Sequence, residues 1–250
     1  MKRIVETYDP QVQRILEMLP GLAAWLVILF PLWGAFFIPR IVAYFTIAFL
    51  IFWFYRSFQA AFLGTRGYFK IRRSEKANWH QLYKKDKDKN SLAWEDIKHL
   101  IIIPSYNESV EKLSTTLDCL AKQKNIKKDQ LTVVLAMEER AADAHQRAKK
   151  LTKKFKGKFG KLITTFHPDG IPGEIRGKAS NEAWAAKKAK KILVDKEGHD
   201  IKNFTITSCD ADACFHPKYF SVLTYLFGLN PNRHLRFWQS PIVWHNNFWR

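Results

Sequence analysis

The chain has 250 residues, which is enough for one or two domains. Lysine and arginine number 41 against 23 aspartate and glutamate residues, so the formal net charge is +18, while 47% of the residues are hydrophobic. This composition excludes a disordered chain, and three cysteines are too few for a disulfide scaffold. A mean hydropathy of −0.27 excludes a channel or carrier with many spans, so the apolar residues must be concentrated in one part of the chain.

That part lies near the N-terminus. Between Gly21 and Tyr55 the only charged residue is Arg40. The pair Pro39–Arg40 divides this stretch into two segments, each close to the roughly 20 apolar residues that cross a bilayer. We therefore expect a transmembrane helical hairpin over residues 21–58. The alternatives are a hairpin buried in a globular core, whose helices seldom run this long without charge, and a cleaved signal peptide, which would begin earlier and be shorter.

The flanking charges predict how this hairpin is oriented. Residues 59–97 form a basic juxtamembrane connector in which Lys84–Lys89 is expected to be an exposed loop. By the positive-inside rule, this excess places the N-terminus and the C-terminal body in the cytoplasm, as parts of an integral protein of the cell (inner) membrane. Residues 1–20 are expected to form an interfacial amphipathic helix, because apolar residues recur there at helical spacing. Those residues are Val12, Ile15, Leu16 and Leu19.

The cysteines and the basic excess point to no further chemistry. Cys119, Cys209 and Cys214 lack the paired spacing of a metal site, and we interpret them as small apolar residues in a reducing compartment. The lysine-rich run Lys149–Lys161 has two interpretations, a solvated or lipid-facing surface and a polyanion site. The first is favoured because a membrane hairpin already holds the domain against lipid, so no nucleic-acid partner is expected.

After residue 97, apolar runs and amphipathic segments alternate. This alternation predicts an α/β domain over residues 98–250 with a doubly wound, mostly parallel sheet. The expected strands are His99–Pro104, Gln130–Ala136, Leu162–Phe166 and Asn203–Ser208, with Arg236–Gln239 as a possible fifth. The expected helices are Ser109–Lys122, Glu138–Phe155, Ala179–Val194 and Pro217–Gly228.

In such sheets ligands bind at the carboxyl ends of the strands, which directs attention to the residues that follow each strand. Asp210 and Asp212 follow the fourth strand, and two carboxylates one residue apart can reach one Mg²⁺ or Mn²⁺ ion together with phosphate oxygens. A loop with a capping aspartate before the next helix is the structural alternative. The first strand is followed by Pro104-Ser105-Tyr106-Asn107-Glu108, in which the tyrosine ring offers a flat face for a base. The segment Gly170–Asn181 carries Arg176 and Lys178 just before a helix, a place suited to a phosphate.

Four segments in this order, IIIPSYNE, RGKASN, CDAD and FWQSP, resemble those of family 2 glycosyltransferases. The chain is most similar to the membrane-embedded branch of cellulose and hyaluronan synthases, over about residues 97–245. The resemblance implies a GT-A fold that binds a nucleotide-sugar, most often a UDP-sugar, with a divalent metal, and transfers the sugar with inversion to a glycan or lipid-linked acceptor.

The resemblance also implies roles for individual residues. It implies that Asp212 is the direct metal ligand and that Asp210 helps to hold the ribose or the metal. Lys178 corresponds to a lysine near the diphosphate, and Gln239 to a residue beside the donor. The residues that match the family's nucleotide-contacting first-strand motif are Pro104, Tyr106, Asn107 and Glu108.

The chain departs from the family pattern at three places. Asn181 lies three residues after Lys178, whereas family members often carry an asparagine five residues after it, where this chain has Ala183. The aspartate that reads uracil in the family is missing after the second strand, and Glu138 is the nearest substitute. The sequence also stops at Arg250, before the motif that supplies the general base, so we expect the donor half of the enzyme to be present and the base to lie beyond Arg250.

Two other functions remain open from the sequence. A metal-dependent nucleotidyltransferase would also use paired carboxylates, but it would need a glycine-rich loop where this chain has PSYNE. A degenerate, membrane-tethered protein that binds nucleotides or polyanions without catalysis would share the same basic charge.

Overall fold

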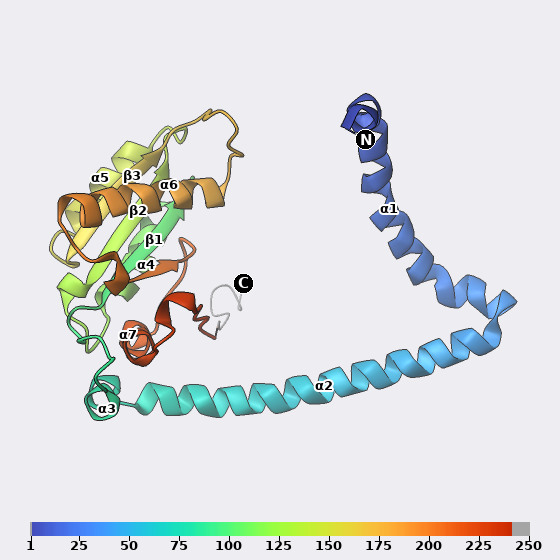
Figure 1. Cartoon of the computed structure of the whole chain (residues 1–250), viewed down its shortest axis with the longest axis horizontal. Helices are drawn as coiled ribbons and strands as arrows, with labels where there is room; N and C mark the ends of the chain where they lie inside the picture. Colours follow the sequence, from blue (N-terminus) through green and yellow to red (C-terminus); the bar gives the residue numbers. More distant parts are fainter. Residues whose placement is uncertain (1, 242–250) are drawn as a thin grey trace. The chain divides into compact units, whose positions relative to one another are not determined.

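A computed structural model describes residues 2–241, with side chains from residue 10 onward. The chain divides into two compact units, which separate between Ser74 and Glu75. The first unit consists of two long helices, and the second is an α/β domain (Figure 1).

The first unit contains α1 (Lys2–Phe37) and α2 (Pro39–Lys76), which are separated by a break at Ile38. Both helices are long and apolar enough to cross a membrane, and their apolar windows bury nothing against the rest of the chain. Next to the break the helices approach closely: a Cβ on Gly34 would lie 2.7 Å from Val42 Cγ2. The expected interfacial segment is continuous with the first apolar helix, and α2 extends through the first half of the expected connector.

The second unit begins with α3 (Trp79–Asp86). The first three residues of the run Lys84–Lys89 therefore belong to a helix, which corrects the expectation of a loop. Asn78 starts this helix because its side chain accepts a hydrogen bond from Gln81 N at 3.2 Å. The helix continues through the lysines because Tyr83, on its other side, is buried.

The core of the second unit is a four-stranded parallel sheet with the order β3-β2-β1-β4. The predicted α/β fold with a mostly parallel sheet, after two apolar N-terminal helices, is thus confirmed. The strands are β1 (Lys98–Ser105), β2 (Leu131–Glu138), β3 (Lys161–His167) and β4 (Phe204–Ser208). The helices that connect and follow them are α4 (Val110–Ala121), α5 (Ala144–Lys154), α6 (Lys178–Lys190) and α7 (Tyr219–Leu229). Short helical turns occupy Lys128–Gln130, Lys191–Lys196, Ile201–Asn203 and Arg233–Leu235.

Helices cover both faces of this sheet (Figure 1). Ile101 and Ile103 of β1 point into a core with α4, α5 and α7, whereas Leu100 and Ile102 point into a second core with α6. The connecting helices change from one face of the sheet to the other because the strand order reverses. The strands β1, β2 and β3 are added in one direction, and β4 is then added on the other side of β1. With right-handed crossovers, that reversal places α6 opposite α4 and α5.

Two sequence expectations about the elements are wrong. The helix expected over Glu138–Phe155 starts only at Ala144, because Met137 and Glu138 pair in register with β3. The segment Arg236–Gln239 is not a strand. Within this segment, Trp238 instead packs against Phe227 of α7, with ring centroids 5.9 Å apart. Residues 242–250 of the expected domain lie outside the described part of the chain.

Candidate functional site

The site lies at the carboxyl ends of β1 and β4. These strands are neighbours in the sheet although β2 and β3 lie between them in the sequence. In an open α/β sheet, the point where the strand order reverses leaves a crevice, because the helices on its two sides lie on opposite faces. The turn after β1 and the turn after β4 therefore both lie at the point of the sheet where open α/β folds usually bind a ligand.

The two aspartates after β4 each face a lysine from a different helix. Lys178 Nζ, at the first residue of α6, donates a hydrogen bond to Asp210 Oδ1 at 2.5 Å. Lys112 Nζ, in α4, lies 3.3 Å from Asp212 Oδ2. The hydrogen bond to Asp210 raises the pKa of Lys178, so the ammonium form persists at neutral pH. This edge of the sheet thus combines two exposed carboxylates with two cations.

The donor set fits a hard divalent cation only in part. Among the described side chains, no group of three histidine, cysteine, aspartate or glutamate residues gathers as a metal site. Mg²⁺ and Mn²⁺ are nonetheless often held by one or two carboxylates plus phosphate oxygens. Asp210 and Asp212 are half or more exposed, at 70% and 52% of their side chains, so both carboxylates are accessible to such an ion.

The turn after β1 is closed on itself by Glu108. Its Oε2 accepts hydrogen bonds from Ser105 Oγ at 2.9 Å and from the backbone N–H of Tyr106 at 2.6 Å. Burial acts to raise the pKa of Glu108, but these hydrogen bonds outweigh it and hold the pKa below its ordinary value. The carboxylate of Glu108 therefore fixes the shape of the turn.

Arg147 of α5 also holds the turn after β1 through hydrogen bonds. It was not among the residues predicted from the sequence. Its guanidinium donates to the carbonyl oxygen of Glu108 at 2.6 Å, to the carbonyl oxygen of Tyr106, and to Ser105 Oγ at 3.4 Å. The side chain is 5% exposed, and Asp143 lies 2.9 Å from its Nε. The sequence contained one sign of this role. Position 147 lies on the buried face of α5 with Ala144, Ala148 and Leu151, and an arginine is rarely buried unless it is paired.

Glu138, the proposed substitute for the base-reading aspartate, is engaged within the protein. Its carboxylate is 7% exposed, with Arg140 Nε at 3.4 Å and His167 Nδ1 at 3.5 Å from Oε2. The same Arg140 lies over the ring of Tyr106, with Cζ 4.3 Å from the ring centroid. Tyr106, Arg140 and Glu138 thus form one cluster across the ends of β1 and β2, and Arg140 was not foreseen.

Other predicted residues lie apart from these contacts. Arg176 is paired through two hydrogen-bonding nitrogens with Asp169, at 2.7 and 3.0 Å, so its charge is already matched. Asn107 and Gln239 are exposed, and Pro104 is a β1 residue opposite Ala136 of β2. The structure thus brings together Lys178 with Asp210, and Tyr106 with Glu108 and the Glu138 cluster.

The cysteine interpretation is wrong for two of the three residues. Cys119 of α4 and Cys214 form a disulfide that joins positions 95 residues apart, with Cα atoms 5.5 Å apart. The spacing in the sequence carried no sign of this pair, because α4 and the segment after β4 meet only through the order of the strands. The bridge also removes the cysteine argument for a reducing compartment. Cys209 alone remains a buried thiol.

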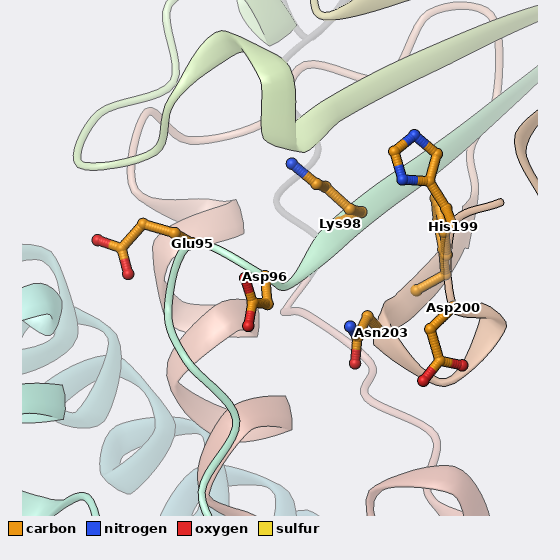
Figure 2. A pocket seen from close by; sticks show the side chains of 7 residues that line it. Glu95, Asp96, Lys98, His199, Asp200 and Asn203 are labelled. Carbon is orange, nitrogen blue, oxygen red and sulfur yellow. The ribbon is translucent and has the colours of Figure 1, made fainter. Parts of the chain in front are cut away.

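A hollow of about 140 Å³ lies at the other end of the sheet, beside the starts of β1 and β4 (Figure 2). Its wall mixes acidic side chains with Lys98 and His199. None of the residues predicted from the sequence lines this hollow. We therefore place the candidate site at the carboxyl ends of the strands, where the charged and aromatic side chains converge.

Comparison with solved structures gives a distant likeness, whereas comparison with family models and curated proteins gives none. No family model matches the sequence, and no curated protein matches it. Among solved structures, the chain is similar to a mannosyltransferase from Pyrobaculum calidifontis, determined in complex with GDP-Man and Mn²⁺. The two are 19% identical with a TM-score of 0.36, and the alignment covers 68% of this chain and 42% of that protein. A likeness at this level assigns neither a family nor an activity to the chain.

Proposed function

We propose that this chain carries the donor-binding half of a membrane-anchored glycosyltransferase that uses a nucleotide-sugar and acts with inversion. The observation that carries the proposal is the contact between Lys178 and Asp210. It joins the start of α6 to the turn after β4 at the reversal point of the sheet, so that a cation and a carboxylate stand where an α/β sheet binds its ligand.

The diphosphate of the donor is the group that this charge pattern suits. The ammonium groups of Lys178 and Lys112 offer positive charge on two sides of the turn after β4. The first backbone N–H groups of α6, beginning at Lys178, have no partners inside the helix, and such helix starts favour phosphate. Asp210 and Asp212 would hold a Mn²⁺ or Mg²⁺ ion, whose charge stabilises the departing nucleoside diphosphate.

The nucleoside is assigned to the cluster across the ends of β1 and β2. Tyr106 is 40% exposed, so its ring has room to contact a base. Arg140 directs its guanidinium to this ring and offers hydrogen-bond donors for base carbonyl oxygens, with Glu138 behind it. A UDP-sugar remains the first choice of donor, as the family resemblance implies, and the acceptor is proposed to be a glycan or lipid-linked glycan.

The decisive experiment is titration calorimetry on the detergent-solubilised chain. UDP and then GDP are added with Mn²⁺ and again with a chelator. Binding that disappears with the chelator supports the proposal, and we expect Asp212→Ala to abolish it because a carboxylate ligand is lost. Asp118→Ala, an exposed carboxylate elsewhere on α4, is the matched control and should bind as the unchanged chain does. Equal binding by Asp212→Ala and the unchanged chain would refute the assignment.

A non-catalytic polyanion binder is the second candidate. The observation in its favour is the net charge of +18 together with the exposed lysines at the end of α5. Binding of this kind weakens steeply as salt is raised, because it releases condensed counterions. If affinity for UDP or GDP follows ionic strength and ignores the chelator, this second function replaces the first.

A further inference from the structure

One face of α4 holds the segment that carries Asp212. Lys112 lies 3.3 Å from Asp212 Oδ2, and Thr116 Oγ1, one turn further, donates to the Ala211 carbonyl oxygen at 2.7 Å. Cys119, again one turn further, forms the disulfide with Cys214. Just after the helix, Lys124 N donates to the Pro217 carbonyl oxygen at 2.7 Å. The disulfide is the only covalent contact in this row, and it lies two residues from Asp212.

The bridge is accessible to reagents in solution. Cys214 is exposed and Cys119 is half-buried, unlike the buried disulfides that stabilise secreted domains. Exposed disulfides are the ones that exchange readily with thiols. The third cysteine, Cys209, does not compete because its thiol is buried.

We propose that Cys119 and Cys214 form a reversible thiol–disulfide site whose partner is a dithiol protein or small dithiol. A thiolate of the partner attacks one sulfur of the bridge, so that the other cysteine leaves as a thiolate and a mixed disulfide forms. The second partner thiol then attacks the partner's own sulfur in this mixed disulfide and releases the remaining cysteine. Two electrons and two protons pass to Cys119 and Cys214, and the partner leaves as a disulfide. The same exchange in reverse restores the bridge.

Reduction of the bridge leaves the segment that carries Asp212 with fewer restraints. The segment 211–217 is then held by the buried bond from Thr116, by the packing of Ala213 and Phe215 against the core, and by the exposed ion pair of Lys112. Gln123 Nε2 and Lys124 N also donate to the carbonyl oxygens of His216 and Pro217. An exposed ion pair does little to restrict a loop. Asp212 is therefore held less firmly when the bridge opens, because the restraint two residues after it is gone while the one at Ala211 remains. This consequence for ligand binding rests on the proposed function, whereas the change in the loop does not.

The test compares the oxidised and the reduced full chain in detergent. Mass spectrometry after alkylation reports the bridge, and hydrogen exchange reports the loop, above all the Ala213 amide, which bonds to the Asp210 carbonyl oxygen at 3.0 Å. With millimolar dithiothreitol we expect Cys119 and Cys214 to be alkylated in the folded chain. We expect exchange at residues 210–214 to quicken by about tenfold. Removal of the reductant followed by addition of oxidised glutathione should reverse both changes.

Two variants sharpen the comparison. The double variant Cys119→Ser with Cys214→Ser should behave like the reduced chain and ignore dithiothreitol. Cys209→Ser should retain the full response, because it leaves the bridge intact. If the bridge resists dithiothreitol in the folded chain, or if exchange at residues 210–214 is the same in both states, the proposal is wrong.

A second measurement separates this proposal from the proposed function. Calorimetry with Mn²⁺ and UDP or GDP should show about tenfold weaker binding or more in the reduced chain, as when a supporting contact of a metal ligand is lost. Equal affinity in both states would refute redox control while leaving the donor site standing. If the oxidised chain binds no nucleotide at all, the proposed function fails, and hydrogen exchange alone decides for or against the reversible loop.

Discussion

Single buried polar residues decide the geometry of this site. Arg147 is the clearest case, because it gathers the carbonyl oxygens of Tyr106 and Glu108 and the hydroxyl of Ser105 around one guanidinium. These carbonyl groups are partly buried, and backbone oxygens shielded from water need a hydrogen-bond donor. Where β1 ends, Arg147 thus supplies the hydrogen bonds that a neighbouring strand supplies within the sheet.

We expect Arg147→Met to lower the free energy of unfolding by about 3 kcal/mol, because it leaves buried oxygens and Asp143 without their donor. Urea unfolding followed by tryptophan fluorescence measures the change. Arg176→Met is the matched control: its pair with Asp169 is exposed and should cost less than about 1 kcal/mol. Similar losses in the two variants would contradict the role given to Arg147.

His99 makes the stability of the sheet depend on pH. The side chain is fully buried, with Nδ1 2.7 Å from Thr205 Oγ1 and Nε2 2.8 Å from Thr224 Oγ1. Thr224 donates its own proton to the Phe220 carbonyl oxygen, so Nε2 carries the proton of the neutral ring and donates to Thr224. Burial lowers the pKa of His99 to about 3.

In the unfolded chain, His99 is protonated as the pH falls through 6.5. In the folded chain, the same residue stays neutral until about pH 3. This contribution to stability is complete above pH 6.5 and is lost as the pH falls, with a slope of at most about 1.4 kcal/mol per pH unit. Urea unfolding between about pH 6.5 and 5, above the range of most carboxylates, measures the slope. The slope of stability against pH should be smaller in His99→Gln. It should be unchanged in His216→Gln, because His216 is exposed. An unchanged slope in His99→Gln would refute the assignment.

At the scale of elements, packing depends on how closely the helices approach. Gly228 of α7 lies against Tyr83 of α3, where an added Cβ would come within 2.7 Å of Tyr83 Cε2. Tyr83 cannot withdraw easily, because it is 2% exposed and its hydroxyl donates to the Leu92 carbonyl oxygen. This contact attaches α3, the first element of the second unit, to the helix after the candidate site.

We expect Gly228→Ala to lower the free energy of unfolding of the second unit by about 1–3 kcal/mol, the usual cost of an overpacked contact. The matched control is Gly67→Ala, because nothing lies within 4 Å of its added Cβ. Gly67 belongs to α2, so its substitution should leave the unfolding of the second unit unchanged. Equal stability of the two variants would show that α3 shifts to accept the methyl group.

At the scale of the whole molecule, the two units have different surfaces. In α1 and α2, from residue 10 onward, large apolar side chains stand exposed along almost the whole length, including Trp25, Phe36 and Phe54. Such a surface is stable in lipid rather than in water. The second unit instead encloses its own two cores on the faces of the sheet.

We therefore expect the full chain to sediment with membranes and the fragment 75–250 to stay in the supernatant after ultracentrifugation without detergent. Labelling with a membrane-impermeant maleimide tests the orientation in intact cells. With Cys209 and the bridge cysteines replaced by serine, a cysteine at Arg40 should react from outside and one at Lys70 should not. Soluble full-length chain would refute the membrane anchor, and the opposite labelling pattern would refute the orientation.

Local patterns in the sequence were enough for much of this architecture. Apolar runs such as HLIIIP indicate buried parallel strands because every side chain of such a strand meets a helix layer, and β1 is indeed buried along its length. The boundaries failed where pairing extended a strand past its apolar run, as at Glu138. Asp210, Asp212 and Lys178 could be singled out because they follow a strand or begin a helix, and such positions can be read along the chain.

The sequence by itself determined the two long apolar helices, the alternation of strands and helices, and the strand-end residues, because each depends on neighbours a few positions apart. Only the tertiary structure decided that β4 lies beside β1, and with it which lysine faces which aspartate, why Arg147 is buried, and that Cys119 meets Cys214. The reason is physical: these contacts join residues that are 32 to 106 positions apart in the chain. The order of the strands brings such segments together, and no periodicity in the sequence encodes that order.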